Sequence, residues 1–298
     1  MLGAMLGGHS RCVCVPESQF IEYQLARADF KPELVEPRQT LAEILSNSRY
    51  RLLWRLQIDP TTVDVREMGS TYAEVLCWLV RAYGQGLGKA TAPIWVDHTP
   101  TNFRRGLTLL RMFPDARFIH LVRDGRGVAA SVLPLDWGPN SIVHAAEFWM
   151  ARCAFGLAAE LELGAERVLR VRYEDVLVDP EATLRRIATF AGLEYEPGLV
   201  AGVGHQPTRY NEHQHRLVGH APDRSRADGW QRVLSARQVE IFEAEVGEFL
   251  NELGYQPQYG IRARPARRDE VFRMRVSDLA RRAQNNLRRQ WRARRSMG

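Results

Sequence analysis

Three short β-rich runs, separated by much longer helical patterns, constrain most strongly what this 298-residue chain can fold into. The runs are APIWVD at residues 92–97, ARFIHLV at 116–122 and RVLRVRY at 167–173. Strands that alternate with helices of a dozen or more residues are typical of βαβ units, whose helices cover a parallel sheet. We therefore predict an α/β fold with a parallel sheet flanked by helices. Apolar residues that recur every three or four positions predict helices near residues 18–28, 36–47, 66–83, 102–112, 140–162, 180–191 and 235–253.

Residues 204–230 interrupt this alternation with a polar stretch that is rich in histidine and arginine and has no clear period. Such a stretch predicts a long functional loop or a partly disordered one. Its histidines could imitate a metal cluster, but we interpret them as scattered side chains of a polar loop and expect no metal. They are His205, His213, His215 and His220.

The composition, with 45% hydrophobic and 26% charged residues, is that of an ordinary water-soluble globular protein. No stretch approaches the roughly 18 consecutive apolar residues of a membrane-spanning helix. The opening MLGAMLGGHSR lacks the basic region of a secretory signal. Four unevenly spaced cysteines fit reduced thiols better than a disulfide framework, so we expect a cytoplasmic protein. Lys31 and Lys89 are the only lysines beside many arginines, which indicates a G+C-rich, bacterial genome.

The net charge of +6 is unevenly distributed along the chain. Residues 261–298 hold 13 arginines against three acidic residues, a balance of +10, so residues 1–260 carry −4. We expect residues 1–260 to form the main domain and residues 261–298 a basic amphipathic helix. One apolar stripe at helical spacing runs through this segment: Phe272, Val276, Leu279, Ala283, Leu287 and Trp291.

Two interpretations of the basic helix remain open. It packs its apolar stripe on the main domain or on another subunit, or it lies on an anionic membrane surface. We do not expect a nucleic-acid partner, because nothing else in the chain is basic enough.

The segment that follows the second β-rich run has the features of an anion site. Arg123 comes directly after the run, at the carboxyl end of the strand, where open α/β sheets bind ligands. Asp124 is a good N-cap, and a helix that begins at Gly125 presents free N–H groups and a partial positive charge. Gly127 and Ser131 are four residues apart, so they share one helical face. An arginine fork with a nearby hydroxyl suits a phosphate group, although a surface arginine paired with Asp124 and a packed serine would give the same sequence.

Four segments together carry a resemblance to a known family. RFIHLVRDGRGVAASV resembles the 3′-phosphate-binding motif of sulfotransferases that use 3′-phosphoadenosine 5′-phosphosulfate, above all the tyrosylprotein sulfotransferases and their bacterial relatives. HTPTNFRRGLTLLRMFPDARF resembles the Thr-Pro turn and helix before that motif, and VLRVRYEDVLVDPEATLRRIATFAGL resembles the next strand and helix. GWQRVLSARQVEIFEAEVGEFLNELGY resembles the closing helix. The resemblance covers residues 1 to about 256 and implies a fold like that of P-loop NTPases, with sulfuryl transfer to a hydroxyl and no metal.

The start of the chain departs from the family pattern. In the family, a strand and a loop reading roughly Arg-Ser-Gly-Thr-Thr precede the first helix and hold the 5′-phosphosulfate. Here Met1 stands where that helix is already under way. We therefore expect the sulfotransferase domain to lack its first strand and phosphate loop, through a start codon chosen too far downstream or a real truncation, of which we favour the former.

The resemblance also assigns two catalytic candidates. Glu17 falls where the tyrosylprotein enzymes place their catalytic glutamate, although the dipole of the following helix would also favour a glutamate there. His98 stands where related enzymes have a lysine that contacts the transferred group or the leaving oxygen. A histidine could donate the same hydrogen bond, serve as the base, or simply be bonded within the turn.

Three further residues are assigned to the nucleotide by resemblance. Tyr173 matches the tyrosine that borders the nucleotide, with packing in the core as the alternative. Arg126 would add to the 3′-phosphate pocket or be solvated, and Trp230 lies in a loop that closes over the nucleotide in similar enzymes.

The sequence leaves two competing functions and an open acceptor. A P-loop nucleotide kinase is disfavoured, because the chain has no Gly-Lys-Ser/Thr and no evident acidic metal ligand. A non-catalytic truncated remnant could instead bind a membrane or a partner through the basic helix. For the sulfotransferase, a protein tyrosine, a glycan, a lipid-linked sugar and a small molecule all remain possible acceptors.

Overall fold

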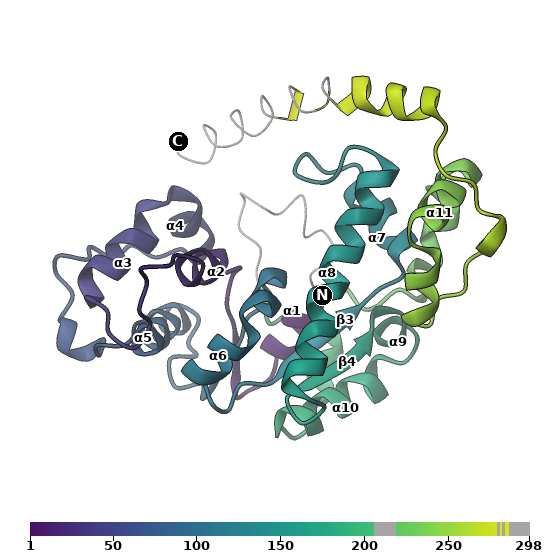
Figure 1. The fold of residues 1–298 in the computed structure, drawn as a ribbon. Coiled ribbons are helices and arrows are strands. Elements are labelled where there is room, and N and C mark those ends of the chain that lie inside the picture. Colours follow the sequence, from purple (N-terminus) through teal and green to yellow (C-terminus); the bar gives the residue numbers. More distant parts are fainter. Residues whose placement is uncertain (206–218, 279–280, 282–283, 286–298) are drawn as a thin grey trace. The chain divides into compact units, whose positions relative to one another are not determined.

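The protein is described by a computed structural model that covers residues 1–205, 219–278, 281, 284 and 285 (Figure 1). The chain divides into two compact units, each made of several segments. The first unit comprises Met1–Phe118, Glu162–Arg167 and Leu184–Ala221, and the second comprises Ile119–Leu161, Val168–Thr183 and Pro222–Gly298. Two helices, α8 (Ile142–Leu163) and α10 (Pro180–Ala191), have residues in both units.

The first unit contains a parallel pair of short strands, β1 (Cys12–Cys14) and β2 (Ile94–Val96). Cys14 lies opposite Val96, and the pairing continues where Val15 N donates to Val96 O at 3.0 Å. Because parallel strands end at the same edge of a sheet, the chain segments after Cys14 and after Val96 leave the pair together. The strand β2 was predicted, whereas β1, with three buried residues, was not.

Helices make up most of the rest of the first unit. They are α1 (Leu2–Gly7), α2 (Gln19–Leu25), α3 (Pro37–Ser46), α4 (Ser48–Trp54), α5 (Tyr72–Gln85) and α6 (Gly106–Met112), with 3₁₀ turns η1 (Val65–Glu67), η2 (Pro100–Arg105) and η3 (Pro197–Ala201). The start of α5 is set by a capping box in which Thr71 and Glu74 exchange hydrogen bonds with each other's backbone. The helix expected over residues 66–83 is interrupted at Gly69, whose φ of 75° lies in the left-handed region.

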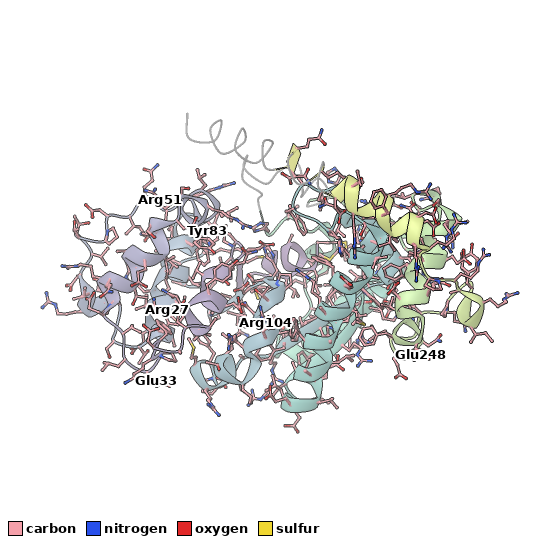
Figure 2. All side chains as sticks on the ribbon, turned by 45° about the horizontal axis from the view of Figure 1, so that its top comes forward. Arg27, Glu33, Arg51, Tyr83, Arg104 and Glu248 are labelled. Atoms are coloured by element: carbon pink, nitrogen blue, oxygen red, sulfur yellow. The ribbon has the colours of Figure 1, made fainter. Side chains whose placement is uncertain are left out.

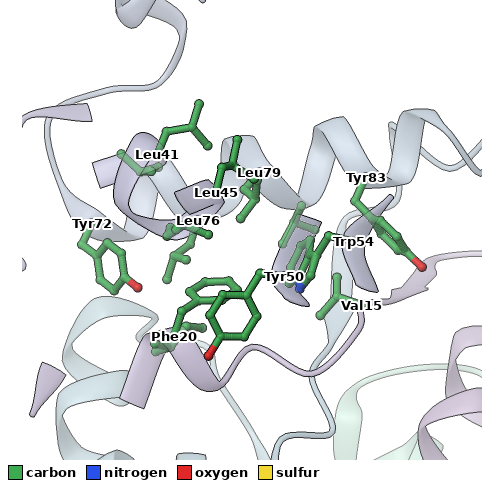
Figure 3. Close-up of a cluster of buried hydrophobic side chains, with 14 of the residues drawn as sticks. Val15, Phe20, Leu41, Leu45, Tyr50, Trp54, Tyr72, Leu76, Leu79 and Tyr83 are labelled. Atoms are coloured by element: carbon green, nitrogen blue, oxygen red, sulfur yellow. The ribbon is translucent and has the colours of Figure 1, made fainter. Parts of the chain in front are cut away.

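The core of the first unit contains a group of aromatic rings among aliphatic side chains (Figure 3). Along α5, Tyr72, Leu79 and Tyr83 turn one buried face toward the other helices. Trp54 packs between Phe20 of α2 and Tyr83 of α5, with its ring centroid 5.6 Å from that of Phe20 and 5.5 Å from that of Tyr83. Charged side chains such as Arg27, Glu33 and Arg51 lie on the outside of this helical region (Figure 2).

The second unit is built around the strand pair β3 (Phe118–Val122) and β4 (Val168–Arg172). A helix follows each strand directly: α7 (Gly125–Val132) after β3, and α9 (Tyr173–Val178) after β4 (Figure 1). The remaining elements are η5 (Arg224–Arg226), η6 (Gly229–Arg232), α11 (Ala236–Glu252) and η7 (Gly260–Arg262). The predicted α/β architecture is thus confirmed, with the strands of the described residues arranged in two pairs.

The C-terminal segment is attached to α11 by carboxylates. Glu243, which is almost fully buried, accepts hydrogen bonds from the backbone N–H groups of Gln258 (2.9 Å) and Tyr259 (2.7 Å). Arg237 joins α11 to Glu270 through two hydrogen bonds of 3.0 and 2.8 Å, and these bonds lower the pKa of Glu270 to about 2. The backbone is helical over residues 268–278. Among the helices of the described residues, none combines the length and apolarity needed to cross a bilayer.

Candidate active site

The turn between β3 and α7 is fixed by its backbone contacts. Arg123 follows the last residue of β3, and its carbonyl oxygen accepts a hydrogen bond of 3.0 Å from the indole of Trp149. The next residue, Asp124, donates its N–H to Glu174 at 3.0 Å and caps α7 by accepting from Arg126 N. The backbone at Arg123 and Asp124 is therefore held by bonds to two other helices, α8 and α9.

The guanidinium of Arg123 lies between an aromatic ring and a glycine. Its central carbon is 4.5 Å from the centroid of the Tyr173 ring, a cation–π distance. On α7, a Cβ placed on Gly127 would lie 3.1 Å from Arg123 Nε, so a larger residue would require the arginine side chain to shift by a few tenths of an ångström. Ser131 is exposed on the same helical face, one turn of about 5.4 Å further along. The structure thus places Arg123 and Tyr173 in contact, on the face of α7 that also carries Ser131.

Arg123 is not neutralised by a carboxylate among the residues that the structure describes. Its Nε is buried and makes no hydrogen bond to any of them. An unsatisfied buried donor costs about 1–3 kcal/mol, more when it is charged. The side chain is therefore suited to an anion that accepts hydrogen bonds from its fork.

Arg126, three residues later, has a different environment. It is only 4% exposed, and its guanidinium donates to Asp124 at 3.0 and 2.7 Å and to Glu243 at 2.7 Å. Its central carbon lies 4.2 Å from the ring centroid of Trp230, which is itself a buried member of the core. Burial works against the charge, but the two carboxylates raise the pKa of Arg126 overall. Arg126 therefore forms an ion-pair cluster with Asp124 and Glu243, on which the Trp230 ring packs. Its burial excludes the solvated alternative for Arg126, while the assignment of Arg126 and Trp230 to the nucleotide stays a prediction.

In the first unit, a hydrogen-bond network joins the segments that follow β1 and β2. Asp97 accepts from Thr99 N at 2.8 Å, from Asn102 Nδ2 at 3.0 Å and from the hydroxyl of Ser18. Ser18 N donates to Thr99 Oγ1 at 2.7 Å. The pKa of Asp97 is raised overall, because the effect of burial exceeds the opposite effect of these hydrogen bonds.

This network connects the two predicted catalytic residues. Glu17 immediately precedes Ser18, and His98 lies between Asp97 and Thr99. Both residues are therefore held at the carboxyl edge of the β1–β2 pair. This network was not predicted from the sequence, although the polar run DHTPTN after a predicted strand indicates polar contacts at that point.

The Glu17 carboxylate is half-buried beside one cation. Its Oε2 accepts from Gln19 at 3.1 Å and from Arg49 at 3.5 Å, while its backbone oxygen accepts from the Trp54 indole at 3.3 Å. Burial raises the pKa of Glu17, more than Arg49 lowers it. A carboxylate whose pKa is raised toward neutrality is a better general base.

His98 lies beside His205, which the sequence predicted to be a scattered side chain of a polar loop. The ring of His205 is T-shaped to that of His98, with centroids 5.2 Å apart, and His205 is only 9% exposed. The sulfur of the buried Cys14 belongs to the same cluster, because the ligand atoms of Cys14, His98 and His205 all lie within 4.8 Å of one another. Of the other histidines of that loop, His220 is exposed, whereas residues 213 and 215 lie outside the described residues.

Comparisons with known proteins agree on one family. The sequence profile of the sulfotransferase family matches residues 1–197. Nodulation protein NoeE of Sinorhizobium fredii is 27% identical over 202 residues, which cover 59% of this chain and 48% of NoeE. A protein-tyrosine sulfotransferase of Drosophila melanogaster is 22% identical over 205 residues, covering 67% of this chain and 37% of that protein. The omega-hydroxy-beta-dihydromenaquinone-9 sulfotransferase Stf3 of Mycobacterium tuberculosis is 29% identical over 169 residues, covering 52% and 40%. The chain thus spans less than half the length of each of these relatives.

Two solved structures share the fold. The sulfotransferase domain of the Synechococcus PCC 7002 olefin synthase is similar with a TM-score of 0.60 at 21% identity, over 86% of this chain and 90% of that domain. The sulfotransferase domain from the curacin biosynthetic pathway gives a TM-score of 0.55 at 17% identity, over 86% and 93%. At such identities the likeness concerns the fold, and the P-loop nucleotide kinase interpretation finds no support in these comparisons.

Proposed function

Because the chain belongs to the sulfotransferase family, we propose that it transfers a sulfuryl group from 3′-phosphoadenosine 5′-phosphosulfate to a hydroxyl-bearing acceptor. The observation that carries the proposal is the guanidinium of Arg123, which no carboxylate of the described residues neutralises. It stands at the end of β3, beside Gly127 of α7.

Arg123 and Ser131 bind the 3′-phosphate of the donor in this proposal. The arginine fork donates two parallel hydrogen bonds to phosphate oxygens, and the exposed hydroxyl of Ser131 adds a third from the next turn. Tyr173 holds the guanidinium in place by stacking on it and borders the nucleotide.

Glu17 and His98 carry out the chemical step. Sulfuryl transfer needs an aligned donor and acceptor, a base for the acceptor hydroxyl, and stabilisation of the charge that develops on the leaving phosphate. Glu17, with its raised pKa, takes the proton of the acceptor hydroxyl. His98 donates a hydrogen bond to the oxygen that accumulates charge, which is the role a lysine plays at this position in similar enzymes.

A labelled-donor assay tests the reaction. The full chain is incubated with donor carrying radioactive sulfate and with four acceptor classes: tyrosine peptides, glycans, lipid-linked sugars and small hydroxylated metabolites. We expect label in at least one class, and its loss in the Glu17→Gln variant. No labelled product with any class, while the nucleotide still binds, would favour the non-catalytic remnant.

We also propose that the basic C-terminal segment contacts an anionic lipid surface. Two members of its apolar stripe, Phe272 and Val276, are 68% and 53% exposed. The opposite side of the segment faces the second unit: Asp278 is 6% exposed and pairs with His144 at 3.1 Å, and Arg281 donates to the carbonyl of Leu133 at 3.0 Å. Phe272 and Val276 therefore do not contribute to the packing of the segment on the rest of the second unit.

The positive charge of the segment favours an anionic partner. Residues 261–298 carry a balance of +10, which complements the charge of an acidic membrane. In a flotation assay at low salt, the full chain should rise with anionic vesicles but not with neutral ones. Replacing Phe272 and Val276 by serine should reduce flotation, and an unchanged result would remove the lipid surface from the proposal.

A further inference from the structure

We infer that Cys14, His98 and His205 form a binding site for a divalent transition-metal ion of the zinc type. The three ligand atoms come from distant parts of the sequence and lie within 4.8 Å of one another. A thiolate with two imidazoles is a ligand set that zinc takes in proteins, and three protein ligands leave one position open for water or substrate.

The backbone brings the three side chains together in the first unit. Cys14 is the last residue of β1 and lies opposite Val96, and His98 follows two residues after Val96. Both therefore stand at the same edge of the strand pair. Their positions relative to each other are fixed by main-chain hydrogen bonds, including Val15 N to Val96 O at 3.0 Å.

His205 is placed by a close contact between glycines. Gly204 N donates to Ala4 O at 2.9 Å, and a Cβ on Gly204 would come within 1.9 Å of the carbonyl carbon of Gly7. A Cβ on Gly7 would in turn lie 2.4 Å from Cys14 Cβ. Only glycine at both positions lets residues 202–205 approach α1 this closely, and the approach brings His205 to Cys14.

Two of the three ligand side chains are buried, and the spacing of the ligand atoms is close to what a metal requires. Cys14 is fully buried and His205 is 9% exposed, so a bound ion would be largely shielded from water. Zinc bonds of about 2.0–2.3 Å correspond to ligand atoms roughly 3.5 Å apart, so the side chains would have to close by about 1 Å. A Cβ on Gly3 would lie 3.2 Å from His98 and 3.3 Å from Cys14 Sγ, which shows that α1 covers the site directly.

Metal binding would compete with the proposed reaction, because it occupies His98. This consequence rests on the proposed function, whereas the site itself does not. The ring nitrogen that holds the ion is lost as a hydrogen-bond donor to the transferring group, and the imidazole keeps one N–H at most. We therefore expect the ion to slow transfer.

Cobalt(II) is the probe that tests the site, because tetrahedral coordination gives it strong visible absorption and a thiolate ligand adds a charge-transfer band. The full chain, reduced and free of chelator, should bind one cobalt ion with both signatures. Cys14→Ser should remove the charge-transfer band. His205→Gln should weaken binding at least about tenfold, since even losing a group that only supports a metal ligand costs about 10- to 100-fold.

Two matched variants control for general effects. Cys12→Ser removes a buried thiol from the same strand, and His220→Gln removes an exposed imidazole; both should bind cobalt as the parent does. Circular dichroism of each variant without metal checks the fold, and if Cys14→Ser does not fold, His205→Gln decides. Absence of one-to-one binding, or an equal loss in the Cys12 control, would overturn the site. Binding of adenosine 3′,5′-bisphosphate, measured on the same samples, reports separately on the proposed function.

Discussion

Replacing Arg123 by alanine should remove most of the binding energy of the nucleotide's 3′-phosphate while leaving the fold intact. Arg123 contacts the Tyr173 ring and approaches Gly127, but no described carboxylate depends on its charge. Its loss costs the fold about 0.5–1 kcal/mol of cation–π contact. Without Arg123, a bound phosphate loses two charge-assisted hydrogen bonds. This loss lowers the binding free energy by about 3 kcal/mol, which is roughly 100-fold in affinity.

Thermal unfolding measures this loss. Ligand at about 100 times its dissociation constant stabilises the parent by about 2.7 kcal/mol, and the same ligand would stabilise a variant weakened 100-fold by about 0.4 kcal/mol. For a chain of this size, 1 kcal/mol shifts Tm by about 2 °C. Adenosine 3′,5′-bisphosphate should therefore raise the Tm of the parent by about 5 °C and that of Arg123→Ala by about 1 °C.

Adenosine 5′-monophosphate isolates the 3′-phosphate, because it lacks that group. Its smaller shift should be the same in the parent and in Arg123→Ala, and Arg262→Ala, which removes an exposed arginine of the second unit, should behave as the parent with both ligands. Arg126→Ala is the contrasting case: it leaves Asp124 and Glu243 without their cation and should cost about 3–5 kcal/mol of stability. Equal shifts with the bisphosphate in the parent and Arg123→Ala would refute the assignment of the site.

Three further predictions concern catalysis and packing. Glu17→Gln should lower turnover by about 10²- to 10⁴-fold while leaving the bisphosphate-induced Tm shift unchanged; a retained turnover would move the base role elsewhere. Because a base must be deprotonated and burial raises the pKa of Glu17, transfer should fall as pH drops through a value above the ordinary glutamate value of about 4.3, and the pH–rate profile of the parent shows whether it does. Gly125→Ala would place a Cβ 2.6 Å from Trp149 and should cost about 1–3 kcal/mol in urea unfolding, whereas Gly247→Ala, with nothing within 4 Å, should be neutral or stabilising by up to about 1 kcal/mol; similar values for the two would contradict the packing.

The local parts of the fold were predictable from the sequence. The strand β3, the N-cap Asp124 and the shared face of Gly127 and Ser131 depend only on residues within one β–α unit. Helical spacing fixes which side chains of such a unit lie together. For that reason the predicted phosphate site could be described before the fold was known.

Features that depend on distant residues were not predictable. The ion pair of Arg126 with Glu243 joins residues that are 117 positions apart in the chain. His205 reaches His98 through a contact between Gly204 and Gly7, and neither glycine carries a local pattern that indicates a partner. The strand β1 is three residues long, too short for its alternation to be recognised.

The central claim is that Arg123 and Ser131 hold the 3′-phosphate of the nucleotide. A crystal structure of the chain with adenosine 3′,5′-bisphosphate tests it most directly. We predict phosphate oxygens at about 2.7–2.9 Å from the Arg123 guanidinium, with the Ser131 hydroxyl bonded to the same group. A nucleotide bound with its 3′-phosphate away from α7, and Arg123 still stacked on Tyr173 without a phosphate contact, would contradict the account.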